Sequence, residues 1–243
     1  MQQIEIRTKS GEVLSGNLFV AVESQKQKTP GLLLIHGWQS GQDRMFETAQ
    51  MFSVELGVTC LTLDLRGHGK SEGSLSVLSR KDFLDDVTAG YDFLAERPEV
   101  DPAQIGVLGS SFGGYLSAIL SSKRQVAWLV LRVPTDFQDD TFEIVKTKAH
   151  DPSVAGTWRQ QPKNWEATHA LRALHIFTGR VLIVASGKDE LVPIETVLNY
   201  KNAVSGAKKL QYVVMKDAPH SLTRHPEFAK QFNEIVYEWY QHL

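Results

Sequence analysis

The feature that most constrains this fold is the alternation of short apolar runs with segments of helical periodicity. Apolar runs end in the motifs HGW, DLRG and GSSFGG, and two more occupy residues 126–133 and 180–186. Amphipathic stretches such as residues 80–96 and 194–204 lie between or after them. A strand that is apolar along its whole length is buried on both faces. The alternation therefore predicts an α/β protein with a mostly parallel sheet and helices on both faces.

Two segments depart from this alternation. Residues 4–8 and 13–22 flank a turn-like KSGE and predict an antiparallel hairpin at the edge of the sheet. Residues 134–179 are polar and irregular but contain several aromatic side chains. Because no repeat or second core is evident, we expect one domain over residues 1–243 with a cap insertion at 134–179.

The charge balance and the single cysteine restrict the partners and the compartment. Lys and Arg total 26 and Asp and Glu total 28, so the formal net charge of −2 does not favour nucleic acid or an anionic membrane as partner. Cys60 is the only cysteine, which excludes an intrachain disulfide and fits a reducing compartment. The first residues lack the apolar core of a signal peptide, and no apolar run is long enough to cross a bilayer. We expect a soluble, cytoplasmic protein without membrane insertion.

The motif GSSFGG lies between a predicted strand and a predicted helix, where ligands bind in doubly wound sheets. The pattern Gly-x-Ser-x-Gly fits only with Ser111 at its centre, so Ser110 occupies a spacer position. Gly109 and Gly113 leave room for a sharp strand-to-helix turn that exposes the central hydroxyl. The turn also places the Phe112 amide at a helix N-terminus, where an oxyanion is stabilised. Ser111 is therefore the candidate nucleophile.

A serine nucleophile needs a base, and the base needs a carboxylate that orients it. Asp189 follows the strand predicted at residues 180–186, and His220 follows the one predicted at 209–215. Both therefore lie beyond strand ends on the same edge of the sheet as Ser111. The chain order is Ser, Asp, His.

Other polar residues compete for these roles. Asp139 and Asp140 follow the strand predicted at 126–133 and are the main rivals for the acid, while Asp217 could bond His220 only locally. His68 precedes the nucleophile and is expected to be structural or to line the substrate site. His150, His169 and His175 show no metal-ligand spacing, so we expect neither a metal nor an organic cofactor.

Five motifs in order, HGW, DLRGHGKSEG, GSSFGG, GKDELVP and APHS, resemble those of the α/β-hydrolase family of serine esterases. The resemblance spans nearly the whole chain and implies an eight-stranded, mainly parallel sheet. It implies Ser111 as nucleophile, Asp189 as acid and His220 as base. It also implies that the amide of Trp38 faces that of Phe112 as the second oxyanion donor.

These observations predict a serine hydrolase that cleaves a small-molecule carboxylic ester through an acyl-serine intermediate. A resemblance to small acyl and cinnamoyl esterases favours esters. A thioesterase or a peptidase could use the same residues, and a non-catalytic binding module on this fold is the alternative from another class. Trp158 and Trp165 are expected to wall the acyl pocket beneath the cap, and the alternative for each is that it packs the insertion onto the domain. Because the insertion is short, we expect short-chain or aromatic esters as substrates.

Overall fold

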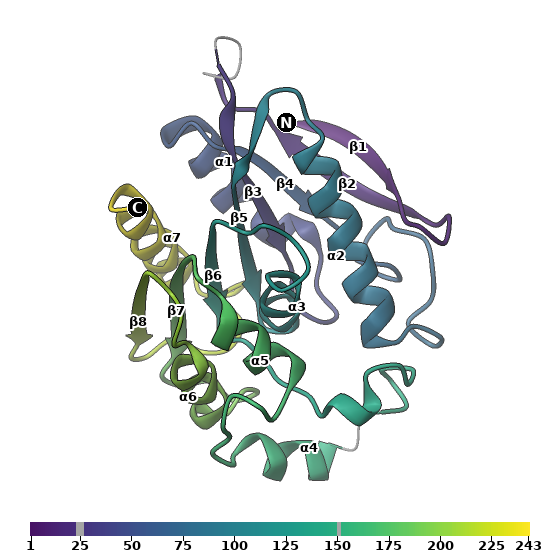
Figure 1. Ribbon diagram of the computed structural model, residues 1–243, viewed down its shortest axis with the longest axis vertical. Helices are drawn as coiled ribbons and strands as arrows, with labels where there is room; N and C mark the ends of the chain where they lie inside the picture. Colours follow the sequence, from purple (N-terminus) through teal and green to yellow (C-terminus); the bar gives the residue numbers. More distant parts are fainter. Residues whose placement is uncertain (23–26, 150–151) are drawn as a thin grey trace.

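The computed structural model describes residues 1–22, 27–149 and 152–243, and within them eight strands form one sheet. The sheet order is β1-β2-β4-β3-β5-β6-β7-β8, with antiparallel pairing only around β2 (Figure 1). This confirms the predicted mostly parallel sheet and its N-terminal hairpin. The strands are β1 (Gln2–Arg7), β2 (Val13–Phe19), β3 (Thr29–Ile35), β4 (Thr59–Leu63), β5 (Val100–Ser110), β6 (Trp128–Arg132), β7 (Arg180–Ser186) and β8 (Lys209–Met215).

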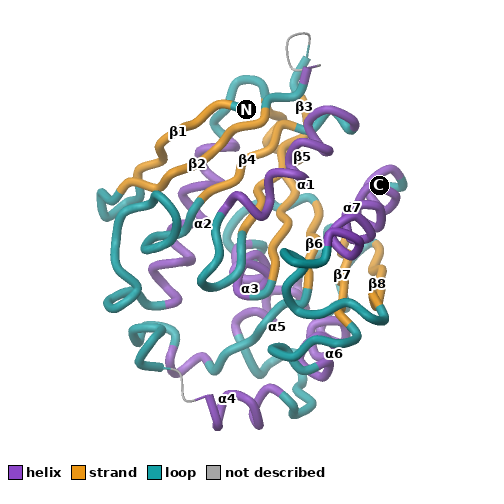
Figure 2. The backbone as a smooth tube through the Cα atoms, turned by 180° about the vertical axis from the view of Figure 1, so that it is seen from behind, coloured by secondary structure: helices purple, strands orange, loops and turns teal. Residues whose placement is uncertain are grey.

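Helices cover both faces of the sheet, as the apolar strands predict. Leu33 and Ile35 of β3 belong to one buried cluster, and Leu32 and Leu34 belong to another on the opposite face. The first cluster contains side chains of α2, α3, α5 and α6, and the second contains side chains of α1 and α7 (Figure 2). The helices are α1 (Phe46–Glu55), α2 (Arg80–Ala95), α3 (Phe112–Leu120), α4 (Pro152–Arg159), α5 (His169–Ile176), α6 (Ile194–Ala203) and α7 (Pro226–Gln241).

Helix α2 shows how local sequence fixes an element. Its cap residue Ser79 accepts a hydrogen bond from the Asp82 amide, and the Asp82 carboxylate accepts one from the Ser79 amide at 2.8 Å. This reciprocal capping satisfies amides that a helix start leaves free. Phe83, Val87 and Leu94 then point from one side of the helix into the core. The predicted helix and its buried face are confirmed.

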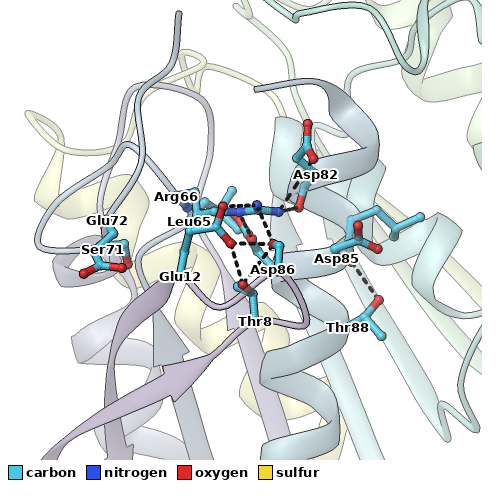
Figure 3. Close-up of polar contacts among 12 residues, drawn as sticks. Thr8, Glu12, Leu65, Arg66, Ser71, Glu72, Asp82, Asp85, Asp86 and Thr88 are labelled. Carbon is cyan, nitrogen blue, oxygen red and sulfur yellow. Dashed lines mark hydrogen bonds and ion pairs between the residues drawn. The ribbon is translucent and has the colours of Figure 1, made fainter. Parts of the chain in front are cut away.

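The loop after β4 is fixed by a buried ion pair between Arg66 and Asp86 (Figure 3). Arg66 Nε lies 2.5 Å from Asp86 Oδ1, and the Arg66 amide donates to Asp86 Oδ2 at 2.9 Å. Arg66 also contacts Glu12 of the N-terminal hairpin at 3.3 Å. Asp64 accepts hydrogen bonds from the amides of Gln42 and Lys70 at 2.9 and 3.1 Å. The loop is therefore bonded to α2, to the hairpin and to the start of α1.

The segment at 134–179 contains more regular structure than its sequence suggests. Ala170, Leu171 and Leu174 of α5 are buried in the core, and α5 packs against α3. Helix α5 is thus the crossover between β6 and β7, and its four buried side chains form too short an apolar stripe to be recognised beforehand. Helix α4 lies farther from the sheet (Figure 1). Residues 150 and 151 lie outside the described part of the chain, and with them His150.

The helices in the described residues are all too short or too polar to cross a membrane.

Candidate active site

Ser111 occupies a strained turn between β5 and α3. Its backbone has φ 54° and ψ −114°, in a region that residues with side chains rarely adopt. The turn is held by its own backbone bonds, because the Ser111 amide donates to the Arg132 carbonyl at 2.9 Å. The Ser111 carbonyl accepts from the amides of Tyr115 and Thr135 at 3.1 and 3.2 Å. The hydroxyl is thereby presented at the carboxyl end of the sheet.

The two glycines of the motif are required by close packing. A Cβ at Gly109 would collide with the Gly113 carbonyl and the Ser117 hydroxyl. A Cβ at Gly113 would collide with the carbonyls of Ile35 and His36 on the neighbouring strand end. Backbone carbonyls cannot move aside as a flexible side chain can. The pattern Gly-x-Ser-x-Gly is thus a steric condition for bringing β3, β5 and α3 together at Ser111.

The structure brings Ser111, His220 and Asp189 into one hydrogen-bonded chain. His220 Nε2 lies 3.1 Å from Ser111 Oγ, and His220 Nδ1 lies 2.8 and 3.0 Å from the two Asp189 oxygens. The side chains of His220 and Asp189 are only 12% and 5% exposed. An Asp189 carboxylate beside Nδ1 favours the tautomer with a proton there. In that tautomer Nε2 carries the lone pair that can accept the Ser111 proton.

Backbone groups orient the carboxylate. Asp189 Oδ1 accepts hydrogen bonds from the amides of Leu191 and Val192 at 2.9 and 2.7 Å. The neighbouring Glu190 accepts from the His220 amide at 3.0 Å, which joins the two loops. Both loops follow strand ends, β7 and β8, as the sequence indicates.

The rival carboxylates lie elsewhere. Asp139 bonds the Arg172 guanidinium and accepts from the His169 amide at 2.8 Å. Asp217 pairs with Lys188 at 2.9 Å. The Asp140 side chain has no hydrogen bond or ion pair among the described residues, and Asp189 is the carboxylate bonded to His220.

The amides of Trp38 and Phe112 flank Ser111. Phe112 is the first residue of α3, and a Cβ at Gly37 would lie 3.4 Å from the Ser111 Cβ, so the HGW turn lies against the serine. Within the described residues neither amide donates a hydrogen bond to the protein. The rings of Trp38 and Phe112 meet edge to face with centroids 5.6 Å apart. An oxyanion hole requires amide donors of this kind, without a partner in the protein, near the nucleophile.

His36 and His68 serve as hydrogen-bond acceptors beneath this turn. His36 Nε2 accepts from the Leu65 amide and His68 Nε2 from the Gln39 amide, each at 3.1 Å. Burial lowers the pKa of His36 to about 4 and also lowers the pKa of His68. Both rings therefore favour the neutral form, in which a ring nitrogen can accept. For His68 this matches the structural role expected from the sequence.

Arg132 is a buried cation that the sequence did not reveal as part of the site. It donates to the His220 carbonyl at 2.6 Å, to the Pro219 carbonyl at 3.3 Å and to the Ser110 hydroxyl at 3.2 Å. Burial lowers its pKa to about 10. The only early signal was a lone arginine within an apolar run. Arg132 thus links the spacer serine to the loop that carries His220.

A cavity of about 1870 Å³ opens over Ser111 and His220. Trp38, Phe137, Lys146 and Arg159 are among its lining residues.

The two tryptophans predicted to wall the pocket are not part of this lining. Trp158 packs under the Lys163 ammonium at 3.9 Å from its ring centroid. Trp165 is 38% exposed and stacks on His175 with ring centroids 3.9 Å apart. The aromatic side chain that the segment contributes to the cavity is instead Phe137. Sequence alone could not decide which aromatic residue turns inward.

No group of three or more His, Cys, Asp or Glu side chains in the described ranges is arranged to hold a metal ion.

A mostly parallel eight-stranded sheet with a strained serine between strand and helix defines the α/β-hydrolase fold, and solved hydrolases of that fold superimpose on nearly the whole chain. The chain belongs to the prolyl oligopeptidase family, whose model matches residues 44–243.

Similar proteins carry several different names. Protein bem46 of Schizosaccharomyces pombe is 27% identical over 208 residues, which cover 86% of this chain and 67% of that protein. The mitochondrial palmitoyl-protein thioesterase ABHD10 of Mus musculus is 29% identical over 121 residues, covering 48% of this chain and 39% of that protein. Est1E from Butyrivibrio proteoclasticus, solved with ferulic acid bound, superimposes with a TM-score of 0.70 and 21% identity, covering 97% of this chain and 98% of that one. At this identity the structural likeness shows the fold alone.

Proposed function

We propose that this protein is a serine hydrolase that cleaves a carboxylic ester through an acyl-serine intermediate. The observation that carries the proposal is the hydrogen-bonded chain from Ser111 Oγ through His220 to Asp189, with distances of 3.1 and 2.8 Å. Membership of a hydrolase family supports it.

In the first half-reaction, His220 Nε2 takes the Ser111 proton as Oγ attacks the ester carbonyl carbon. Asp189 holds the ring and stabilises the imidazolium that forms. The amides of Trp38 and Phe112 donate to the carbonyl oxygen as it becomes negative. The C–O bond to the alcohol then breaks, His220 returns the proton to the leaving oxygen, and the acyl group stays on Ser111.

In the second half-reaction, neutral His220 accepts a proton from water as the water oxygen attacks the acyl-serine. Collapse of this second tetrahedral species breaks the bond to Ser111 Oγ, and His220 returns the proton to the serine. The products are the free acid and the original enzyme. Water supplies the only atoms added.

The same residues serve an ester or a thioester, because they do not select the leaving group. The ferulic acid bound to Est1E supports an ester with an aromatic or short acyl group, and the likeness to the palmitoyl-protein thioesterase ABHD10 supports a thioester. We place the ester first, since the cavity wall includes the ring of Phe137. We also propose that residues 134–168 form a cap segment over the site of a single domain.

The test is a panel of 4-nitrophenyl esters and matching thioesters, with acyl groups from acetyl to palmitoyl and a cinnamoyl series. We expect the highest kcat/KM for short or aromatic esters, and a loss of several orders of magnitude in Ser111→Ala. Ser110→Ala is the matched control, because its hydroxyl accepts from Arg132 and it is the Ser111 hydroxyl that bonds His220 Nε2. Equal turnover in Ser111→Ala and the native protein would refute the proposal.

A further inference from the structure

Lys146 is a buried cation in the wall of the active-site cavity. It is only 7% exposed, and its ammonium lies 3.4 Å from the centroid of the Trp38 ring and 5.0 Å from that of Phe112. Among the described residues, no carboxylate pairs with it and no acceptor bonds its Nζ. Burial lowers its pKa to about 7, and the nearby charges of Arg159 and Arg80 act in the same direction. A buried charge normally has an ion-pair partner, so a buried ammonium without one in a cavity wall indicates a place where an anionic ligand group could bind.

Arg80 and Arg159 are two further cations, and both lie near the ring of Phe137, as Lys146 does. The guanidinium carbons of Arg80 and Arg159 lie 4.8 and 4.7 Å from the centroid of the Phe137 ring, and the Lys146 ammonium lies 5.4 Å from it. Arg80 is fully buried and donates to neutral groups on Tyr115 and Gln138. The cluster therefore has three positive side chains gathered on one ring.

Among the described residues no carboxylate forms an ion pair with Arg80, Lys146 or Arg159, although the charge of Asp136 acts on Arg159. Arg159 donates its Nε to the Asp136 carbonyl at 3.0 Å, and its two Nη atoms have no hydrogen-bond acceptor among the described residues. The Asp136 carboxylate itself accepts from the Phe137 amide and the Thr168 hydroxyl, at 2.9 and 3.2 Å. Burial raises the pKa of Asp136 to about 7, which weakens it further as a counterion. Lys146 and Arg159 both line the cavity, so a ligand could reach them.

Lys146 lies on the side of β5 away from His220, whereas the Arg159 carbonyl accepts from the Thr196 hydroxyl of α6, which follows β7. The Lys146 amide donates to the Leu78 carbonyl at 2.8 Å, which places this stretch beside the loop between β4 and α2 (Figure 1). His220 follows β8. In the sheet, β4 and β8 lie on opposite sides of β5, the strand that leads to Ser111. Since His220 must reach the leaving oxygen, the leaving group lies on its side and the acyl group extends toward Lys146.

We propose that Lys146 and Arg159 bind a carboxylate at the far end of the acyl group, so that the preferred substrates are half-esters or half-thioesters of dicarboxylic acids. This inference rests on the proposed function and adds the chemical class of the acyl group. A carboxylate placed there would accept charge-assisted hydrogen bonds from both side chains in a partly dry site. The acidic residues of the cavity wall are Asp43 on the turn before α1, Glu47 on α1, and Asp189 and Glu190 on the loop after β7.

The first experiment compares two 4-methylumbelliferyl esters of equal length, the adipate half-ester and the hexanoate. We expect the native protein to prefer the adipate half-ester in kcat/KM, and Lys146→Met to reduce that preference on the order of tenfold or more. Lys146→Arg keeps the charge and should retain most of the preference. Lys148→Met is the matched control, because Lys148 is exposed two residues away. A preference that is absent, or unchanged in Lys146→Met, would overturn the inference.

The second experiment separates this inference from the proposed function. Adipate is titrated calorimetrically into Ser111→Ala protein, with and without Lys146→Met. We expect adipate to bind at least about tenfold more weakly when Lys146 is replaced, whether or not the native protein cleaves any ester. Equal binding to both proteins would refute the carboxylate site. Lys146-dependent binding without hydrolysis of either ester would instead refute the proposed chemistry.

Discussion

The two sides of the cavity differ in how far the protein satisfies its own polar groups. At the strand ends, Asp189 and His220 are hydrogen-bonded to each other, and the carboxylate accepts two further backbone amides. On the side of the cap segment, Lys146 and Arg159 bring charge to the cavity without forming an ion pair among the described residues. Residues that are already held by hydrogen bonds, as on the side of Asp189 and His220, suit bond making and breaking. Cations without an ion-pair partner, as on the side of Lys146 and Arg159, suit the binding of an anionic ligand group. We infer that chemistry and selectivity are divided between the two.

The largest effect on turnover is expected from a substitution of Asp189 that keeps the shape of its side chain but removes its charge. Asp189→Asn should lower kcat on the order of 10³–10⁴-fold, because the amide would stabilise the wrong imidazole tautomer. Circular dichroism and thermal melting would check that the fold is retained. Asp139→Asn is the control, since Asp139 pairs with Arg172 and not with His220. Near-native rates in Asp189→Asn with inactivation in Asp139→Asn would show that the acid has been misassigned.

A smaller effect on stability is expected from the neutral histidine beneath the HGW turn. Burial lowers the pKa of His36 to about 4, below the ordinary value near 6.5 that it regains on unfolding. Between these values the unfolded state binds more protons, so stability is lost as the pH falls below about 6.5. From pH 7 to pH 5 this group should remove about 2 kcal/mol of the unfolding free energy.

Urea unfolding at the two pH values measures this loss in the native protein and in His36→Gln. The glutamine variant should lose about 2 kcal/mol less between pH 7 and pH 5 than the native protein does. His242→Gln, at an exposed position near the C-terminus, should behave as the native protein. The same pH dependence in His36→Gln would mean that His36 is not held neutral.

The smallest effect is expected from the two tryptophans outside the cavity lining. Trp158→Ala and Trp165→Ala should each change kcat/KM by less than about threefold, because neither ring borders the space over Ser111. Phe137→Ala should lower kcat/KM for aromatic esters by more than either of them. Ester kinetics on the three variants would check this order. A large loss of kcat/KM in either tryptophan variant would show that this tryptophan also contributes to substrate selection, in addition to Lys146 and Arg159.

Much of the fold follows from the sequence because the strands β3 to β7 are mostly apolar and each is followed by a helix. The catalytic residues could also be predicted from the sequence wherever the chemistry restricts which residues can stand at neighbouring positions. Only one register of GSSFGG puts glycine on both sides, and that register selects Ser111. Asp189 and His220 could be chosen because they follow strands that end at the same edge of a parallel sheet.

The remaining features depend on three-dimensional neighbours. Helix α5 has only four buried side chains in its short length, too few to distinguish it from a loop in advance. In the sequence Lys146 and Arg159 cannot be told from ordinary surface cations. Only the structure shows that they line the cavity and form no ion pair with a carboxylate among the described residues. Trp158 and Trp165 are residues of a type that often lines apolar pockets, but the direction in which each ring points is set by tertiary packing.

The central claim is that Ser111 is a nucleophile activated by His220, and covalent labelling tests it most directly. The protein would be treated with a fluorophosphonate, digested, and the modified peptide identified by tandem mass spectrometry. We predict one phosphonylated residue, Ser111, in the native protein and in Ser110→Ala, with labelling strongly slowed in His220→Ala. An adduct on Ser110 or on any other residue, or undiminished labelling without His220, would contradict this account.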